Sequence, residues 1–217
     1  MSWGLRFASK VRSLHVTVLT YPSNQRRRFR ALVRLYTFQV LKLGKIRTVV
    51  RLGAHSKVLW DPRQANTIQI AYMNPPDIVH WKFWSKVLGP GNTFVDVGSN
   101  VGVYTILAAE RGARVVAFEP DPRNLPALRR NLALNGLDTC AEVRPVALGA
   151  ECGFLTMRTG LGPLSHMDTE ATSEKIPHVA GLEQVVTVST LDQEIHEQVA
   201  GAKIDVEGYE LEVLKGA

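Results

Sequence analysis

The sequence has few cysteines, no long apolar run, and no acidic residue in its first 60 positions. Two cysteines, Cys140 and Cys152, are too few for a disulfide framework and lack the spacing of metal ligands. We therefore expect no metal site and a reducing compartment, the cytoplasm. No segment approaches the roughly 20 consecutive apolar residues of a membrane-spanning helix. The composition, 45% hydrophobic and 21% charged, is typical of a globular protein.

The missing acids make the charge distribution uneven. Residues 1–60 carry 13 Lys or Arg, whereas residues 61–217 carry 13 basic and 20 acidic residues. The net charge of +6 therefore comes entirely from the N-terminal arm. Residues 1–22 lack the apolar region and cleavage site of a secretory signal, although an organelle transit peptide stays an alternative. The length of 217 residues suits one α/β core with a small appendage.

The N-terminal arm contains an amphipathic pattern. Ser23 can cap a helix that runs to about Leu43, with Gly44 at its end. The helix would be either a lid that packs its apolar stripe on the core, which we favour, or a basic surface for an anionic membrane or polymer. Apolar residues share one face and arginines lie elsewhere: Phe29, Leu32, Val33, Tyr36, Val40 and Leu43, against Arg26, Arg27, Arg30 and Arg34.

Strands are expected over residues 47–60 and 67–73, with turn residues between them. The following Asn74-Pro75-Pro76-Asp77 resembles the loop with which some nucleic-acid methyltransferases hold a flipped base. Such enzymes place an aromatic residue where this chain has Asp77. A helix that starts at the prolines and runs to Val87 is the simpler interpretation.

The most informative stretch begins with the apolar run Phe94–Val97, which ends directly in glycines. This pattern predicts a buried parallel strand that turns sharply into a helix. Gly98 and Gly102 would allow the tight turn and let a ligand approach backbone N–H groups. Asn100 is the predicted N-cap of a helix over residues 101–111.

Glu119 follows Asp96 by 23 residues, at the end of the next apolar run. A carboxylate at this position binds ribose hydroxyls in nucleotide-binding βαβ units. The chain lacks the third glycine of a dinucleotide fingerprint, and Asp96 would repel a pyrophosphate but attract an ammonium group. S-Adenosylmethionine carries that ammonium group and no phosphate. A glycine pair alone would fit an ordinary tight turn equally well.

The second half continues the alternation of helices and strands. Asp121 is the predicted cap of the next helix, with Pro122 at its first position. A third strand is expected over 142–148, then a long polar loop over 149–183. The segment 184–189 should pair antiparallel with 154–158, and a short helix should begin near Leu191.

The last chemical stretch is Lys203–Val206, a predicted strand that Gly208 turns into a helix carrying Leu211 and Leu214. With period two, Lys203, Asp205 and Glu207 share one side of the strand. Such residues in a buried strand are costly without a purpose, although an internal Lys–carboxylate pair would also explain them.

Four segments together resemble the FkbM family of S-adenosylmethionine-dependent methyltransferases: FVDVGSNVG (94–102), AFEPDP (117–122), NLALNG (131–136) and KIDVEGYELEVLKGA (203–217). The resemblance implies a class I, Rossmann-like, doubly wound, mostly parallel α/β sheet with strand order 3-2-1-4-5-7-6. It also implies O-methylation of a hydroxyl on a sugar, glycolipid or secondary metabolite. The expected cofactor-binding residues are Asp96, Gly98, Ser99, Asn100, Gly102, Glu119, Pro120 and Ala147, and the expected catalytic residues are Asp205 and Glu207 with Lys203 in support.

The chain departs from the family pattern because it ends about a dozen residues past the fourth parallel strand. We therefore expect a basic extension over 1–91 and a C-terminally incomplete methyltransferase domain over 92–217. The alternative is a non-catalytic module that binds an adenosine ligand or an anionic surface. The expected partner is a small-molecule or glycan hydroxyl acceptor and not a nucleic acid.

Overall fold

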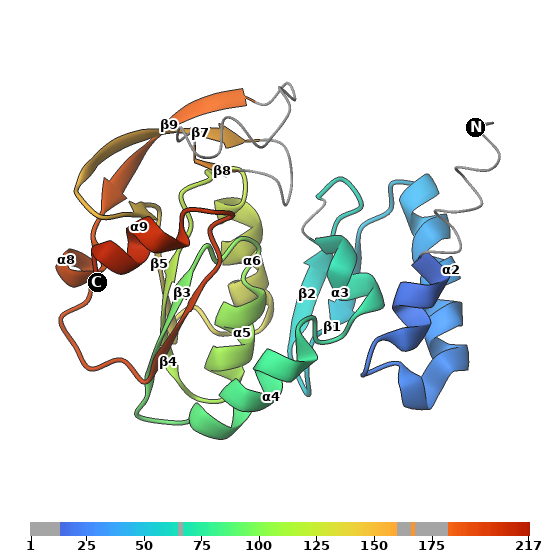
Figure 1. Ribbon diagram of the computed structural model, residues 1–217. Helices are drawn as coiled ribbons and strands as arrows, with labels where there is room; N and C mark the ends of the chain where they lie inside the picture. Colours follow the sequence, from blue (N-terminus) through green and yellow to red (C-terminus); the bar gives the residue numbers. More distant parts are fainter. Residues whose placement is uncertain (1–13, 65–66, 160–165, 168–181) are drawn as a thin grey trace.

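The computed structural model describes residues 14–64, 67–159, 166–167 and 182–217. Its centre is a parallel four-stranded sheet in the order β10-β3-β4-β5 (Figure 1). The strands are β3 (Thr93–Val97), β4 (Arg114–Phe118), β5 (Ala141–Arg144) and β10 (Gly201–Ile204). This is the 3-2-1-4 part of the expected order, with β10 at the edge of the sheet, and it confirms the Rossmann-like class.

Helices cover both faces of this sheet, as a doubly wound fold requires. Phe94 and Val115 pack in one hydrophobic cluster with residues of α5 (Val103–Glu110) and α6 (Leu125–Leu134). The alternate side chains, including Val95 and Val116, pack in a second cluster with Val213. That cluster includes α8 (Leu191–Glu194) and α9 (Glu210–Lys215), which lie on the other side of the sheet (Figure 1). Leu211 and Leu214, the apolar residues that the sequence predicted in α9, are exposed, and Val213 is buried instead.

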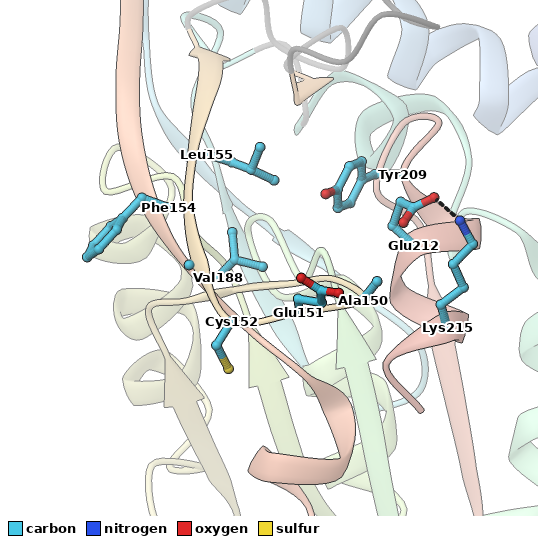
Figure 2. Close-up of a pocket in the computed structure, with 10 residues that line it drawn as sticks. Ala150, Glu151, Cys152, Phe154, Leu155, Val188, Tyr209, Glu212 and Lys215 are labelled. Atoms are coloured by element: carbon cyan, nitrogen blue, oxygen red, sulfur yellow. Dashed lines mark hydrogen bonds and ion pairs between the residues drawn. The ribbon is translucent and has the colours of Figure 1, made fainter.

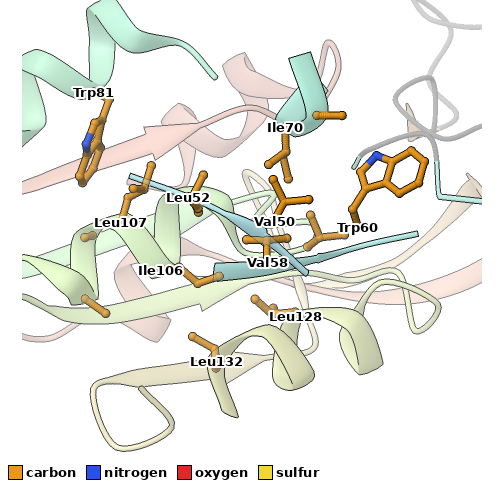
Figure 3. Close-up of a cluster of buried hydrophobic side chains, with 14 of the residues drawn as sticks. Val50, Leu52, Val58, Trp60, Ile70, Trp81, Ile106, Leu107, Leu128 and Leu132 are labelled. Atoms are coloured by element: carbon orange, nitrogen blue, oxygen red, sulfur yellow. The ribbon is translucent and has the colours of Figure 1, made fainter. Parts of the chain in front are cut away.

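The N-terminal region packs against the α5–α6 face. It comprises η1 (Gln25–Arg27), α2 (Arg28–Leu43), the antiparallel pair β1 (Thr48–Arg51) and β2 (Lys57–Trp60), and α4 (Ile78–Val87). Leu52 and Trp60 share one hydrophobic cluster with Ile106 and Leu128 (Figure 3). The division of the chain near residue 91 stays a prediction, and this cluster extends across it.

The stretch 47–60, expected to be extended, contains the separate strands β1 and β2. The predicted strand over 67–73 is wrong, because this segment contains the helix α3 (Ile68–Tyr72). Thr67 closes the preceding turn, with its hydroxyl donating to the Asp61 carbonyl at 2.8 Å. The consecutive residues Ile70, Ala71 and Tyr72 are all buried. A helix wedged between α2 and β2 can bury three successive side chains, whereas a strand alternates its faces.

The predicted helix is present as α4 and ends at Val87, but it begins at Ile78 and not at the prolines, which lie in the preceding turn. Asn74 is not available to hold a base, because its side chain binds the β1–β2 hairpin. Its Oδ1 accepts from Gly53 N, and its Nδ2 donates to the Arg51 carbonyl.

The favoured lid interpretation of α2 is also wrong. The helix exists, but it packs through Ala31, Leu35 and Phe38, and most of the predicted apolar stripe is exposed. Arg34 lies on neither outer face: its guanidinium donates to Asn24 Oδ1 and to the Tyr72 carbonyl, both at 2.8 Å. Ser23 does not cap α2, since three residues of η1 precede it.

A second, mostly antiparallel sheet follows the central one, in the order β6-β9-β7-β8. It contains β6 (Ala147–Leu148), β7 (Gly153–Thr159), β8 (His166–Met167) and β9 (Leu182–Ser189). The expected antiparallel pairing of β7 with β9 is confirmed. The single strand expected over 142–148 is instead split between β5 and β6, which belong to different sheets. The expected loop over 149–183 contains β7 and β8, and much of its remainder lies outside the described residues.

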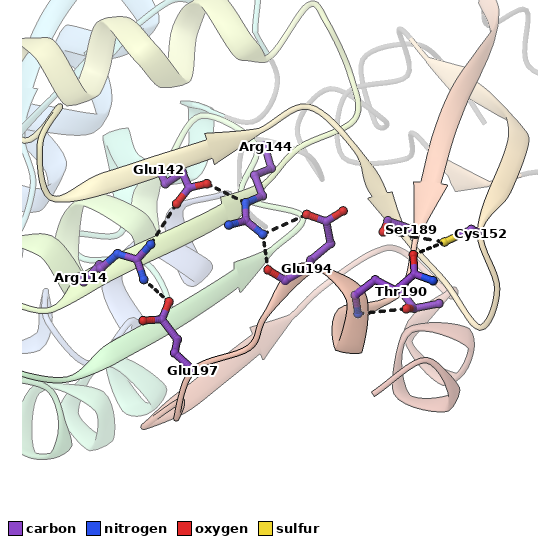
Figure 4. A network of polar contacts seen from close by, with 9 residues as sticks. Arg114, Glu142, Arg144, Cys152, Ser189, Thr190, Glu194 and Glu197 are labelled. Atoms are coloured by element: carbon purple, nitrogen blue, oxygen red, sulfur yellow. Dashed lines mark hydrogen bonds and ion pairs between the residues drawn. The ribbon is translucent and has the colours of Figure 1, made fainter.

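A network of ion pairs joins β4, β5 and α8 (Figure 4). Arg144 contacts Glu142 at 2.8 Å and Glu194 at 2.9 Å, and Arg114 contacts Glu142 at 3.0 Å and also Glu197. The Arg144 guanidinium lies 5.7 Å from the centre of the Phe118 ring. The Arg114 pairs lie at the start of β4, and the Arg144–Phe118 contact lies at its end, directly before Glu119.

Candidate active site

The loop between β3 and α5 forms the centre of the candidate site. Gly98, Asn100 and Gly102 have φ angles of 72°, 53° and 87°, the left-handed region that glycine adopts without strain. A Cβ on Gly98 would overlap the Asp205 carbonyl oxygen, and one on Gly102 would overlap the Leu128 side chain. The Asp205 backbone therefore requires glycine at position 98, whereas at position 102 the Leu128 side chain can shift and the positive φ is the stronger reason for glycine.

Asn100 is not the N-cap that the sequence predicted. α5 begins at Val103, and Gly102 occupies the N-cap position. Asn100 instead donates its backbone N–H to Glu119 Oε2 at 2.7 Å. Asn100 is thus a left-handed residue between the two glycines, and its hydrogen bond to Glu119 holds the loop in this conformation.

Glu119 is almost fully buried at the end of β4. Its Oε1 accepts from Asp121 N at 2.9 Å and from Asn124 Nδ2 at 3.2 Å. Burial raises the pKa of Glu119, and the hydrogen bonds from Asp121 and Asn124 oppose that shift. The prediction that Asp121 caps the next helix is wrong. α6 begins at Leu125, so Asp121 lies before the helix and does not cap it. The half-buried Pro120 follows Glu119 directly.

Asp96 is fully buried in β3, and its two oxygens differ. Oδ2 accepts a hydrogen bond of 2.6 Å from the Thr105 hydroxyl of α5. Oδ1 has no hydrogen-bond partner and lies 3.6 Å from Lys203 Nζ. Strand pairing explains this approach, because Lys203 in β10 lies directly opposite Asp96.

Lys203 connects the glycine loop to the last strand. Its Nζ donates to the Gly98 carbonyl at 2.9 Å and lies 3.4 Å from Asp205 Oδ2. The ammonium also lies 5.7 Å from the centre of the Tyr104 ring. The structure therefore brings Asp96, Lys203 and Asp205 together at the carboxyl ends of β3 and β10, where ligands bind in open parallel sheets.

The expectation that Glu207 shares the strand side of Lys203 and Asp205 is wrong. β10 ends at Ile204, and Asp205 is the last residue to pair, through its N–H to the Val97 carbonyl at 3.2 Å. Glu207 has a φ of 52° in the exposed turn before α9. The alternation of a strand does not extend to such a residue.

The loop has the unsatisfied polar atoms that a bound amino-acid group would satisfy. Asp96 Oδ1 and Ser99 Oγ are both buried without a hydrogen-bond partner. Buried polar atoms of this kind call for a specific explanation, and a ligand ammonium supplies donors for both. Ala147 is buried in β6, where it packs with Met157, Val186 and Val188 of the second sheet, and its place in the cofactor site stays a prediction.

A family model for the methyltransferase FkbM domain matches residues 96–217, more than half of the chain. The chain belongs to the FkbM methyltransferase family. The match begins at Asp96 and includes the glycine loop, Glu119 and the β10–α9 segment. It therefore covers every residue of the candidate site that is described above.

The FkbM chain is also similar to several curated or solved methyltransferases. It is 26% identical over 149 residues to "Methyltransferase 1" of Beauveria bassiana, covering 58% of this chain and 59% of that protein. It is 33% identical over 127 residues to a probable cobalt-precorrin-6B C(15)-methyltransferase of Halobacterium salinarum, covering 54% and 67%. The structure of Pyrococcus horikoshii TYW2 with MeSAdo gives a TM-score of 0.39 at 21% identity, covering 48% and 37%. The chain spans about 59–67% of the length of these curated relatives.

Sequence reasoning missed two residues that lie beside the candidate site. Thr105 and Tyr104 lie on the first turns of α5 and contact Asp96 and Lys203 respectively. Burial raises the pKa of Tyr104, and the carboxylates of Asp77, Asp96 and Asp205 raise it further, so its phenol stays protonated and can donate a hydrogen bond. The glycine loop was the available signal, because it fixes which helix follows it and which residues begin that helix.

A cavity of about 460 Å³ lies apart from the FkbM glycine loop, between the second sheet and α9 (Figure 2). Its lining includes Cys152, Leu155, Tyr209, Glu212 and Lys215, and none of the predicted site residues. Among the described residues, no cluster of His, Cys, Asp or Glu could hold a metal ion. No described helix is both long and apolar enough to cross a membrane.

Proposed function

We propose that this domain transfers a methyl group from S-adenosylmethionine to a hydroxyl group of a sugar, glycolipid or secondary metabolite, in the cytoplasm. The observation that carries the proposal is the contact of Lys203 with Asp96, Gly98 O and Asp205 beside the glycine loop. It supports the proposal because the carboxylate of Asp205 lies close to the loop that would hold the donor. Membership of the FkbM family supports the same reaction class.

The donor would be held by residues of the loop and the end of β4. Asp96 Oδ1 and Ser99 Oγ would accept from its ammonium group, and Glu119 would accept from a ribose hydroxyl. Lys203 weakens the attraction between Asp96 and the donor ammonium, because it already neutralises part of the Asp96 charge. S-Adenosylmethionine supplies an electrophilic methyl carbon, whose bond to sulfur breaks as a new bond to oxygen forms.

The acceptor side depends on Asp205. A hydroxyl oxygen that attacks the methyl carbon must lose its proton, and a carboxylate within reach can take it. Asp205 is exposed on the outer side and paired with Lys203 on the inner side. Lys203 would orient the carboxylate and stabilise negative charge on the acceptor oxygen. Glu207 stays a weaker candidate for the same role, because it lies beyond the end of β10.

The related proteins do not indicate which acceptor this chain uses. The names of the related proteins differ in their acceptors, which include a cobalt-precorrin carbon and ribosomal protein L11. The protonated Tyr104 beside Lys203 favours an acceptor with hydrogen-bonding oxygens, as a sugar or polyol has.

Calorimetric titration with S-adenosylmethionine and with NAD tests the donor, and only the first should bind. Transfer of a labelled methyl group to a panel of hydroxyl acceptors then tests the reaction. Asp205→Asn should reduce turnover by about 10²–10⁴ without changing donor affinity, the range for loss of a general base. Asp192→Asn, an exposed carboxylate on α8, is the matched control. Donor binding without transfer to any acceptor would instead favour the non-catalytic binding module.

A further inference from the structure

The exposed face of α2 is apolar along its whole length. Phe29, Val33, Tyr36, Val40 and Leu43 are spaced by three or four residues, and each is at least half exposed. The exposed fractions of Phe29, Val40 and Leu43 reach 78%, 66% and 85%. Ile46, directly after the helix, continues the row at 51%. We name these six residues the α2 stripe.

The α2 stripe lies opposite the face that attaches the helix to the protein. At about 100° per residue, the five helical members of the stripe span an arc of about 80°. The centre of that arc is about 200° from the centre of the buried residues Ala31, Leu35 and Phe38. Within the described chain, Tyr36 contacts His15 through a hydrogen bond of 2.7 Å between its hydroxyl and Nε2. The other stripe members are exposed and directed outward, and α2 lies at the margin of the fold (Figure 1).

Positive charge surrounds the α2 stripe at both ends. Arg27, Arg28 and Arg30 are exposed at its start, and Lys42 and Lys45 are exposed at its end. No Asp or Glu occurs before Asp61. A helix with an exposed apolar face, flanking Arg or Lys and aromatic residues on that face is the pattern of an interfacial helix that lies in a bilayer surface.

We propose that the α2 stripe is a docking surface for an anionic lipid bilayer. The apolar side chains would enter the boundary between headgroups and acyl chains, and the flanking cations would contact the lipid phosphates. The charges argue against a second copy of this chain, because two α2 faces would bring like charges together without an acid to pair them. The proposal does not depend on the methyltransferase reaction.

Co-sedimentation of the full chain with phosphatidylcholine vesicles, with and without phosphatidylserine, tests the proposal. Binding should require phosphatidylserine and should weaken as salt is added. The double variant Phe29→Ser/Val40→Ser should weaken binding at least about tenfold, since it removes two apolar side chains from the bilayer. The double variant Arg27→Gln/Arg30→Gln should weaken it by about fivefold for each residue.

Matched controls distinguish the α2 stripe from a general surface effect. Phe154→Ser/Val185→Ser removes side chains that are 75% and 66% exposed on the second sheet, and it should leave vesicle binding unchanged. Arg129→Gln/Arg130→Gln on α6 does the same for charge. Equal losses in the controls, no binding, or equal binding to phosphatidylcholine alone would overturn the proposal. So would a stripe variant that alters the oligomeric mass but retains vesicle binding. S-Adenosylmethionine titration of each variant provides a separate measurement of the methyltransferase site.

Discussion

Glu119→Ala should weaken S-adenosylmethionine binding through the loss of one hydrogen bond to the ribose. A carboxylate offers about four acceptor positions. Three are occupied, by Asn100 N on Oε2 and by Asp121 N and Asn124 Nδ2 on Oε1. One position remains on the side that faces the loop. A hydrogen bond to a charged acceptor contributes about 1.5–3 kcal/mol, so the dissociation constant should rise about 10- to 150-fold.

A second effect of the same substitution must be separated from the first. Removal of the carboxylate also leaves Asn100 N and Asp121 N without their acceptor, which loosens the loop for every ligand. A double-mutant cycle separates the two effects. The wild type and Glu119→Ala are each titrated with S-adenosylhomocysteine and with its 2′-deoxy and 3′-deoxy analogues.

If Glu119 binds a ribose hydroxyl directly, one deoxy analogue should lose affinity only in the wild type, with a coupling of about 1.5–3 kcal/mol. Equal losses in wild type and variant, for both analogues, would refute direct contact and leave Glu119 as a loop-positioning residue. Glu110→Ala is the matched control, because Glu110 also accepts from backbone N–H groups, those of His55 and Ser56, but far from the loop. The raised pKa of Glu119 also predicts how donor affinity depends on pH. As the pH falls, Glu119 should become protonated above the usual carboxylate range, and wild-type affinity for the donor should fall with it. Glu119→Ala should lack this pH dependence.

Three further predictions concern stability. Gly98→Ala should lower the free energy of unfolding more than the control Gly91→Ala. Both positions have a positive φ, which costs a residue with a side chain about 1–3 kcal/mol, but only a Cβ at position 98 meets a neighbouring carbonyl. Equal unfolding midpoints in urea for the two variants would contradict this. Lys203→Met should destabilise by about 3–5 kcal/mol in urea unfolding, since it strands the buried Asp96, and adding Asp96→Asn should restore part of the loss; additive losses would exclude the pair. Arg63 holds the pKa of Asp61 below its usual range, burial opposes this, and Arg47 adds to it. Stability from Asp61 is therefore present above about pH 4 and lost below it, so Asp61→Asn should flatten the acid limb of a pH–stability curve.

Local patterns were sufficient to predict the centre of the fold. Phe94–Val97 is apolar and ends in glycines, which leaves few alternatives to a buried strand and a sharp turn. Glu119 could be placed because it ends the next apolar strand. The pairing of Lys203 with Asp96 could not be predicted from spacing alone, since 107 positions separate them. It required the strand order, which places β10 beside β3.

The errors share a physical cause, because periodicity identifies an apolar face but does not show what covers it. The α2 stripe is the stronger pattern in the sequence, yet the helix packs through the shorter set Ala31, Leu35 and Phe38. Arg34 made that second face appear polar, although its guanidinium serves as an internal donor to Asn24 and Tyr72. Similarly, Asn100 has the residue type of an N-cap, but Glu119 draws its backbone N–H into a left-handed turn.

Lys203 links these observations to the chemistry of the site. An isolated buried carboxylate at Asp96 would be costly, and Thr105 satisfies only one of its oxygens. The Lys203 ammonium offsets that cost, but at 3.6 Å it leaves Oδ1 without a hydrogen bond. Its shorter contact is with the Gly98 carbonyl, so it also fixes the loop. One cation on the edge strand thus contacts the buried Asp96 carboxylate, the Gly98 carbonyl of the glycine turn and the Asp205 carboxylate. We therefore expect its loss to affect both donor affinity and turnover, whereas the loss of Asp205 should affect turnover alone.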